Sequence, residues 1–455
     1  MISAFFAEKV TGMIYGQVET PLKTRLVKLL ADLKGSIIGA FGVMVVAVTA
    51  AGVLNYAFNI VMTRFLGKAG AFGEFYALSA IFLIVSIGAG SFQTVIAKYV
   101  AGFSTKGEQD KITVLTRYFS RWFLYASACV IALSVLIAYP LARMLKLESP
   151  LYVVILGSSV AVSVYITLPY GILQGMERFV FLGGATVATA VLRLVFGIIL
   201  VLLGAGVYGA LGAATAAGLV VILVLIASSR EYFFGKTSSE EEFHPIAAVK
   251  YLLPVASAMF LILFLTQVDA VLVKALFSRK EADIYSYAAL AGKAVFFFPD
   301  GISLVMFPRV SALKARGEPT KRVLYLSLAA VVLIVCAVTI FYQFFPVLSA
   351  RFFAGSRGVS IARIRGFLGL RLVVLFGLVM SIYAILKLIA LYLLAHERTR
   401  FVFFLLAGGL IQVLGIIFFA RRLPDVLLVM LCVGLVLLVY NLLLALRVPI
   451  TKGET

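Results

Sequence analysis

The chain has 455 residues, of which 63% are hydrophobic and only 13% are charged, and its mean hydropathy is +1.11. No water-soluble surface can be built from this composition, which excludes a soluble globular protein. The formal net charge of +20 would suggest a nucleic-acid partner in a soluble protein. Here most Lys and Arg residues lie in short connections between apolar runs, where they set membrane topology. We therefore expect a lipid bilayer as the partner, and no nucleic acid.

The first 35 residues are mixed in character and precede the first long apolar run. Residues 23–34 are rich in Lys and carry leucines at helical spacing. This pattern predicts an amphipathic helix that lies on the cytoplasmic face of the membrane.

Apolar runs, each long enough to cross roughly 30 Å of hydrocarbon as a helix, recur from residue 36 onward. They are continuously apolar rather than alternating, which favours helices over a closed β-barrel. The sequence therefore predicts an all-α polytopic membrane protein. Its polar breaks place twelve spans near 38–65, 75–101, 117–140, 151–174, 179–203, 206–228, 247–276, 284–308, 323–348, 367–394, 401–420 and 424–446.

The longest internal polar stretch runs from Ser228 to about Lys250 and separates six spans from six. Lys and Arg are more frequent at the connections on the N-terminal side, which predicts that both termini lie in the cytoplasm, beneath a cell membrane. The expected parts are a cytoplasmic segment, an N-lobe, a linker, a C-lobe and a tail, at 1–35, 36–229, 230–246, 247–447 and 448–455.

The two halves share a phrase that indicates an internal duplication. Shifting the chain onto itself superposes Tyr76 on Tyr287, Ala77 on Ala288, Gly90 on Gly301, Lys98 on Arg309 and Ala101 on Ala312. Two related six-helix halves around a pseudo-two-fold axis are typical of many transporters.

Catalytic and nucleotide-binding motifs are missing from the sequence. The two histidines, His244 and His396, lie in predicted loops, and neither a Gly-x-x-x-x-Gly-Lys-Ser/Thr loop nor an Asp-x-Asp motif occurs. We therefore expect neither an enzyme nor a protein driven directly by ATP, and no cofactor.

Four basic residues lie inside the predicted spans: Arg193, Lys293, Lys387 and Arg371. A central Arg or Lys costs about 3 kcal/mol to insert, so each needs a carboxylate, a route to the interface or a watery cavity. The sequence offers too few acidic partners for all four, which predicts a cationic cavity. Phosphate or pyrophosphate would supply the missing counter-charge, and Arg suits bidentate phosphate binding.

Two acidic residues, Asp269 and Asp300, lie well inside the spans. Asp269 is interpreted either as a site for a coupling cation, Na⁺ or H⁺, or as a structural partner of Lys274 or Arg193. Asp300 follows Pro299, which predicts a kink that serves as a hinge. Lys293 and Asp300 are seven residues apart and could form a structural pair.

Uncharged polar residues inside the spans are the remaining binding candidates. Gln93, Gln174, Asn55 and Asn59 can bond sugar hydroxyls, although such amides more often bond a neighbouring helix.

Several phrases of the sequence resemble the polysaccharide transporter and oligosaccharide flippase branch of the multidrug/oligosaccharidyl-lipid/polysaccharide exporter superfamily. The matching phrases are Thr63–Phe75, Gln93–Ala101, Leu168–Phe179, Gln267–Lys274, Ala288–Ala294 and Phe307–Val310. The resemblance implies two six-helix lobes arranged as a V, with a central cavity that opens alternately to either side. It also implies a cargo of oligosaccharide on a polyprenyl (pyro)phosphate, and glycan polymerases or glycosyltransferases of the same pathway as partners.

The leading hypothesis is a secondary flippase whose substrate anion binds Arg193 and Lys293, with sugar contacts from Gln93 and Gln174. A cation-coupled drug antiporter of the same superfamily is the first alternative, and it should show a mainly acidic cavity. A membrane glycan polymerase or ligase would need a large outer loop with catalytic residues. A non-transporting scaffold would leave the buried charges without a purpose.

Overall fold

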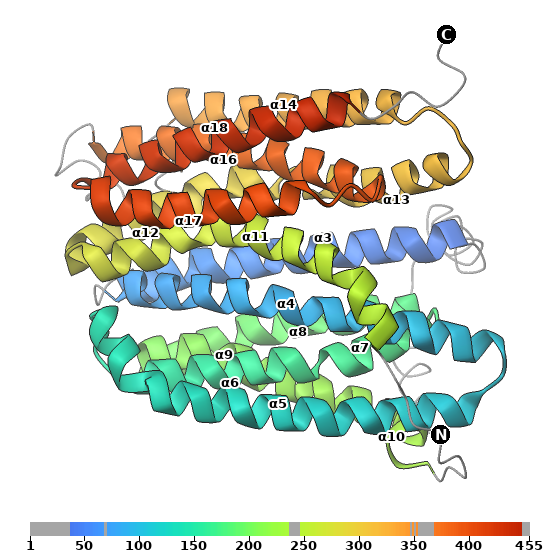
Figure 1. Ribbon diagram of the computed structural model, residues 1–455. Coiled ribbons are helices and arrows are strands. Elements are labelled where there is room, and N and C mark those ends of the chain that lie inside the picture. The colour runs from blue at the N-terminus through green and yellow to red at the C-terminus, as the bar shows by residue number, and fades with distance from the viewer. Residues whose placement is uncertain are drawn as a thin grey trace, which may run out of the picture.

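The computed structural model describes residues 37–67, 71–235, 246–345, 348–349, 352–353 and 368–447. The regular structure of these residues is helical (Figure 1). The N-terminal half contains α3 (Ile37–Leu66), α4 (Phe72–Thr105), α5 (Gln109–Met144), α6 (Leu151–Tyr165), α7 (Thr167–Gly175), α8 (Phe179–Leu200), α9 (Gly206–Ser228) and the short α10 (Arg230–Phe234). The C-terminal half contains α11 (Ile246–Leu276), α12 (Arg279–Phe297), α13 (Asp300–Ala315), α14 (Lys321–Phe344), α16 (Leu368–Ala395), α17 (Phe401–Phe419) and α18 (Leu423–Leu446).

Within the described ranges, eleven helical stretches are long and apolar enough to cross a membrane. One of them, Phe179–Ser228, holds 50 residues, which is too long for one crossing. A π-helical turn, η2 (Val201–Ala205), ends α8, and Gly204 and Gly206 adopt φ values of 89° and 51° there. Only glycine enters this region without steric cost, so the chain turns and α9 begins. Because the stretch Phe179–Ser228 contains two crossings, α8 and α9, the eleven stretches correspond to the twelve predicted spans.

Two of the predicted spans are interrupted in the structure. The fourth consists of α6 and α7, which meet at Ile166. The eighth breaks between α12 and α13, because Pro299 lacks the backbone N–H that would continue the helix. The predicted kink at Pro299 is thus present, whereas its role as a hinge stays a prediction. The ends of α4 and α5 extend several residues beyond the predicted spans, because polar residues can continue a helix into the interface.

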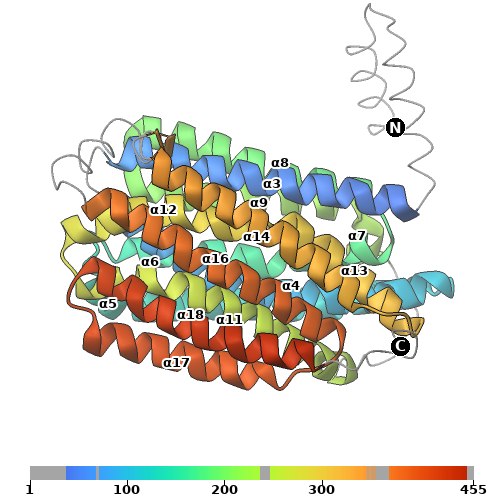
Figure 2. The ribbon, with the colours of Figure 1, turned by 90° about the horizontal axis from the view of Figure 1, so that it is seen from above.

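The helices form two groups that lie side by side in Figure 1, and the C-terminal group lies in front of the N-terminal group in Figure 2. In the first group α3 packs on α8, α5 on α6 and α4 on α7, and in the second α16 packs on α12, α14 and α18. The two groups meet mainly where α4 contacts α11 and α12. This arrangement confirms the predicted two-lobed helical fold.

Large apolar side chains cover the outside of the bundle. Leu136 of α5, Leu333 of α14 and Phe403 of α17 expose 70% or more of their surface. A soluble monomer does not expose an apolar surface of this extent, so lipid must cover it. The predicted amphipathic segment 1–35, most of the linker 230–246 and the tail 448–455 lie outside the described residues.

Candidate functional site

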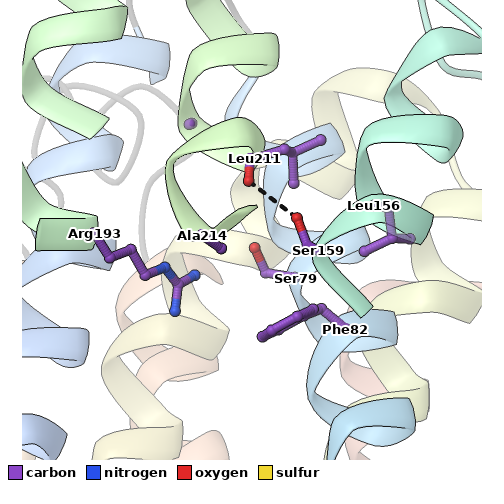
Figure 3. Close-up of a pocket in the computed structure, with 8 residues that line it drawn as sticks. Ser79, Phe82, Leu156, Ser159, Arg193, Leu211 and Ala214 are labelled. Atoms are coloured by element: carbon purple, nitrogen blue, oxygen red, sulfur yellow. Dashed lines mark hydrogen bonds between the residues drawn. The ribbon is translucent and has the colours of Figure 1, made fainter. Parts of the chain in front are cut away.

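The N-lobe contains a small pocket between α4, α6, α8 and α9, and Arg193 of α8 points into it (Figure 3). Ser79 and Phe82 of α4 form one wall. The other walls come from apolar or hydroxyl-bearing residues of α6 and α9: Leu156, Ser159, Ala210, Leu211 and Ala214. The pocket thus brings one charged group together with several small side chains.

Arg193 has a neutral hydrogen-bond partner. Its Nη1 donates to Oδ1 of Asn55 on α3 at 3.1 Å, and its guanidinium carbon lies 4.4 Å from the ring centre of Phe58. Within the described part of the chain, its buried Nε has no hydrogen-bond partner, and neither has the buried Oγ of Ser79. Buried donors without partners are costly. The pocket has a volume of about 10 Å³, which is room for one water-sized group, so in this conformation a ligand could place only a single polar atom beside these donors.

The C-lobe holds its cation differently. Lys293 of α12 and Asp269 of α11 are 2% and 0% exposed, and Nζ of Lys293 lies 2.9 Å from Oδ1 of Asp269. Nζ also donates to Oε1 of Gln267 at 3.2 Å, and the Tyr285 hydroxyl donates to Oδ2 of Asp269 at 2.8 Å. The suggested pairing of Asp269 with Lys274 or Arg193 is therefore wrong, because the facing helix α12 presents Lys293 to it. Lys293 is likewise enclosed by protein instead of lining an open cavity.

A second intramembrane ion pair joins Lys387 of α16 to Asp300 at the start of α13, with 2.6 Å between Nζ and Oδ1. The suggested pair between Lys293 and Asp300 is therefore wrong, because the break at Pro299 separates the two residues. The Lys387 and Asp300 side chains are 18% and 36% exposed, so this pair is more accessible than the first. Arg371 lies on α16, but its side chain is outside the described residues.

The four polar amides of the N-lobe all have hydrogen-bond partners within the protein. Nε2 of Gln93 on α4 donates to Oε1 of Gln174 on α7 at 2.8 Å, across a close helix contact. Asn55 and Asn59 each donate to a backbone carbonyl one turn earlier in α3, at 2.9 Å. Asn55 is thus the one of these four that the structure brings to Arg193.

An ion cluster joins the two lobes at the end where α3 stops and α4 starts. Glu74 of α4 lies 3.6 Å from Lys274 of α11 and 3.3 Å from Arg279 of α12. Glu74 and Lys274 are 0% and 1% exposed, and Arg279 reaches on to Glu148 at 2.6 Å. The sequence analysis missed this cluster because its members lie near helix ends, where a charge is usually interfacial. A signal was present, since Glu74 and Lys274 both fall within the phrases that resemble the flippase branch.

Hydrogen bonds and a ring contact between the lobes surround this cluster. The backbone N–H of Gly73 donates to Oδ1 of Asp283 at 2.7 Å, and the Phe72 and Tyr287 rings stack 5.0 Å apart. Nζ of Lys146 donates to the carbonyl of Phe277 at 2.9 Å. The lobes are therefore tightly closed against each other at this end.

Comparisons with known proteins agree with this architecture. The model of the family described as "Polysaccharide biosynthesis protein" matches residues 39–314, whereas no curated protein sequence matches. An inward-facing multidrug resistance MATE family transporter of the MOP superfamily superposes with a TM-score of 0.70 at 13% identity, over 88% of this chain and 96% of that one. Its outward-facing conformation gives 0.62 at 15% identity, over 91% and 96%. The lipid II flippase MurJ in an inward closed conformation gives 0.67 at 15% identity, over 89% and 87%.

Proposed function

Because the chain belongs to the polysaccharide biosynthesis protein family, we propose that it is a flippase that moves a polyprenyl-(pyro)phosphate-linked oligosaccharide from the inner to the outer leaflet of a cell membrane. One observation carries the proposal. Arg193 is a cation in the middle of a membrane-spanning helix, and no carboxylate among the described residues pairs with it.

An anionic substrate resolves the electrostatic problem that Arg193 poses. A central cation in the membrane costs about 3 kcal/mol when it has no counter-charge. A phosphate oxygen placed beside Nε and the Ser79 hydroxyl would provide that charge and would satisfy both unpartnered donors. The planar guanidinium can also hold two oxygens of one phosphate, which supports a phosphate ester over a simple halide.

We propose Lys387 as a second cation for the same substrate. Its ammonium is partly exposed and its partner Asp300 is more so, so an incoming anion can compete for it. Gln93 and Gln174 would contact sugars only after exchanging their mutual hydrogen bond, and this exchange costs little for a pair of amides.

The ion cluster around Glu74 supports a transport cycle in which the lobes separate at that end. We propose that both termini lie in the cytoplasm; the cluster would then lie at the outer face, and this conformation would be closed to the outside. Glycosyltransferases that build the lipid-linked sugar and a polymerase that consumes it are the pathway partners that this function requires.

The test is leaflet translocation of a fluorescent polyprenyl-pyrophosphate oligosaccharide in proteoliposomes, scored by accessibility to an external enzyme. We expect protein-dependent movement that Arg193→Ala reduces at least tenfold. Arg316→Ala is the matched control, because it removes the same charge from an exposed helix end whose side chain is 72% exposed. No movement with the natural chain would overturn the proposal, and exchange of a cationic dye for protons would establish a drug antiporter in its place.

A further inference from the structure

Arg193 needs a counter-charge in every state of the protein, including the state without substrate. We propose that a halide ion such as chloride occupies the pocket beside Arg193 and Ser79 when the substrate is absent, and that a phosphate oxygen of the substrate displaces it. The exchange with substrate rests on the proposed function, whereas the halide site rests on the pocket alone. The halide is a counter-ion here and not the transported cargo.

The N-lobe has no carboxylate of its own to neutralise Arg193. The helices that line the pocket or contact Arg193 are α3, α4, α6, α8 and α9, and Glu74 is the one acidic residue within their bounds. Glu74 belongs to the ion cluster between the lobes. In the C-lobe, the intramembrane carboxylates Asp269 and Asp300 each have a lysine partner. The counter-charge of Arg193 therefore comes from a bound ion or from the substrate.

The pocket has the size and the donors of a site for one small anion. Its volume is about 10 Å³, which is room for one water-sized group. Among the described residues, the buried Nε of Arg193 and the buried Oγ of Ser79 have no hydrogen-bond partner, and Ser79 is only 9% exposed. Both residues line this pocket, and the Arg193 side chain extends toward Ser79 (Figure 3). One ion that accepts hydrogen bonds can satisfy both donors together.

A water molecule fits the volume of the pocket but not its charge. It would leave the guanidinium without a counter-charge inside the membrane, where a bare cation is costly. The two hydrogens of the water would also need acceptors, whereas Phe82, Leu156 and Leu211 present apolar side chains to the pocket. A halide supplies the missing charge and needs donors only.

The volume of the pocket also selects among anions. A whole phosphate or carboxylate group is larger than one water molecule, so in this conformation it could place only one oxygen beside the donors. A chloride ion is slightly larger than water, and the long side chain of Arg193 can shift to admit it. A monatomic anion is thus the ligand that this closed pocket can enclose entirely.

The halide and the substrate would use the same donors in turn. A phosphate oxygen beside Nε of Arg193 and the Ser79 hydroxyl takes the place of the halide, so the two anions exclude each other. After the substrate leaves, a halide from the aqueous phase restores the counter-charge. The substrate-free protein can then change conformation without carrying a bare cation through the membrane. Halide should therefore lower the apparent affinity for substrate.

The first experiment measures halide binding without any substrate. The full chain in lipid nanodiscs is unfolded thermally while potassium chloride replaces potassium gluconate, whose anion is too large for the pocket, at constant ionic strength. Because a ligand of the folded state stabilises it, we expect the unfolding temperature to rise with chloride and then to saturate. Arg193→Met should abolish the rise, and Ser79→Ala should weaken chloride binding severalfold. Arg316→Ala, which removes an exposed cation, is the matched control and should retain the rise.

A further variant tests the location without removing the charge. Ala214 of α9 lines the pocket, so the larger side chain of Ala214→Val should fill it and abolish the chloride effect while Arg193 remains. If Arg193→Met does not fold, Ala214→Val and Ser79→Ala decide the question in its place. A chloride effect unchanged in both of these variants would overturn the inference.

The second experiment measures binding of a polyprenyl-pyrophosphate-linked monosaccharide in chloride and in gluconate, and we expect weaker binding in chloride. An unfolding temperature equal in the two salts, or a rise that persists in Arg193→Met, would overturn the halide site and leave the flippase proposal standing. Chloride binding without competition would overturn the exchange. Chloride binding with no binding of the probe in either salt would overturn the flippase proposal and leave the halide site standing.

Discussion

Each lobe buries a cation within the membrane, but the two cations lie in opposite electrostatic settings. Arg193 of the N-lobe meets an amide and an aromatic ring, and its Nε has no hydrogen-bond partner in the described structure. Lys293 of the C-lobe meets a carboxylate, an amide and, across it, a tyrosine. The first arrangement leaves positive charge available to a ligand, whereas the second neutralises it internally. A buried cation therefore indicates a binding site only when no carboxylate of the protein neutralises it, so the partners of the cation must be known first.

The largest expected effect is a difference in protein stability between removing the C-lobe cation and removing the N-lobe cation. Lys293→Met leaves the Asp269 carboxylate buried without its counter-charge, and we expect it to lower the free energy of unfolding by about 3–5 kcal/mol. Arg193→Met removes a cation that has no carboxylate partner, so it should change this free energy little. Thermal unfolding in nanodiscs at about pH 8 measures both.

The control combines Lys293→Met with Asp269→Leu, which replaces the pair by apolar side chains of similar volume and should recover most of the lost stability. Equal losses for Lys293→Met and Arg193→Met would show that the two cations are held in the same way.

The next effect concerns the shape of the N-lobe cation. Arg193→Lys keeps the charge but loses the planar fork, so we expect substrate affinity to fall about tenfold with little change in stability. Ser79→Ala should weaken binding less, by about 1 kcal/mol, because it removes one neutral donor. An affinity unchanged in both variants would contradict a phosphate at this pocket.

A comparable effect is expected at the closed end, where the backbone N–H of Gly73 contacts Asp283 of the other lobe. A Cβ at Gly73 would lie 2.6 Å from Oδ1 of Asp283 and 3.1 Å from its backbone nitrogen. Gly73→Ala should therefore disfavour the closed state by about 1–3 kcal/mol. Maleimide labelling of Phe277→Cys, with the three native cysteines replaced, measures the opening.

The matched control for Gly73→Ala is Gly102→Ala in the same helix, where a Cβ would meet nothing within 4 Å. Labelling that rises equally in both variants would show that the helix, and not the contact between lobes, is disturbed.

The smallest effect involves His396, just beyond α16. Burial lowers the pKa of His396 from its usual value of 6.5, and the nearby Lys314 and Arg398 lower it further. The folded protein therefore binds this proton less readily than the unfolded chain, so stability should fall as the pH drops below about 6.5. His396→Gln should flatten this part of a plot of unfolding temperature against pH. If the unfolding temperature of His396→Gln depended more steeply on pH than that of the natural chain, protonation of His396 would not be the cause of the lost stability.

The sequence predicted the helices well because membrane spans depend on local hydropathy. Their number, most of their ends and the break at Pro299 follow from short windows of residues. The pairing of buried charges depends instead on which faces of distant helices meet. Asp269 and Lys293 are 24 residues apart, and Arg193 and Asn55 are 138 apart. No local pattern encodes these contacts, which is why the cations were identified but their partners were not.

The ion cluster around Glu74 could not be predicted from local sequence either, because its contacts join the two lobes. Its members come from α4, α11, α12 and the connection before α6, so only the meeting of the two lobes brings them together. Each is close to a helix end, and hydropathy alone treats such a charge as solvated. Repeated or family-typical phrases were the better guide here, because they marked Glu74 and Lys274 without explaining them.

Because α4 is long, a small rotation of this helix produces a large displacement at its end. Its 34 helical residues make a rod of about 50 Å. Gly171 and Gly175 let α7 press directly on the backbone of α4 near Gln93 and Ala97, so this part of the rod is fixed to its lobe. A tilt of about 10° around that fulcrum would carry the far end, where Glu74 lies, through roughly 5 Å. A displacement of that size at Glu74 would break its ion pairs with Lys274 and Arg279. A small rotation of one lobe is therefore enough to separate the two lobes at this end.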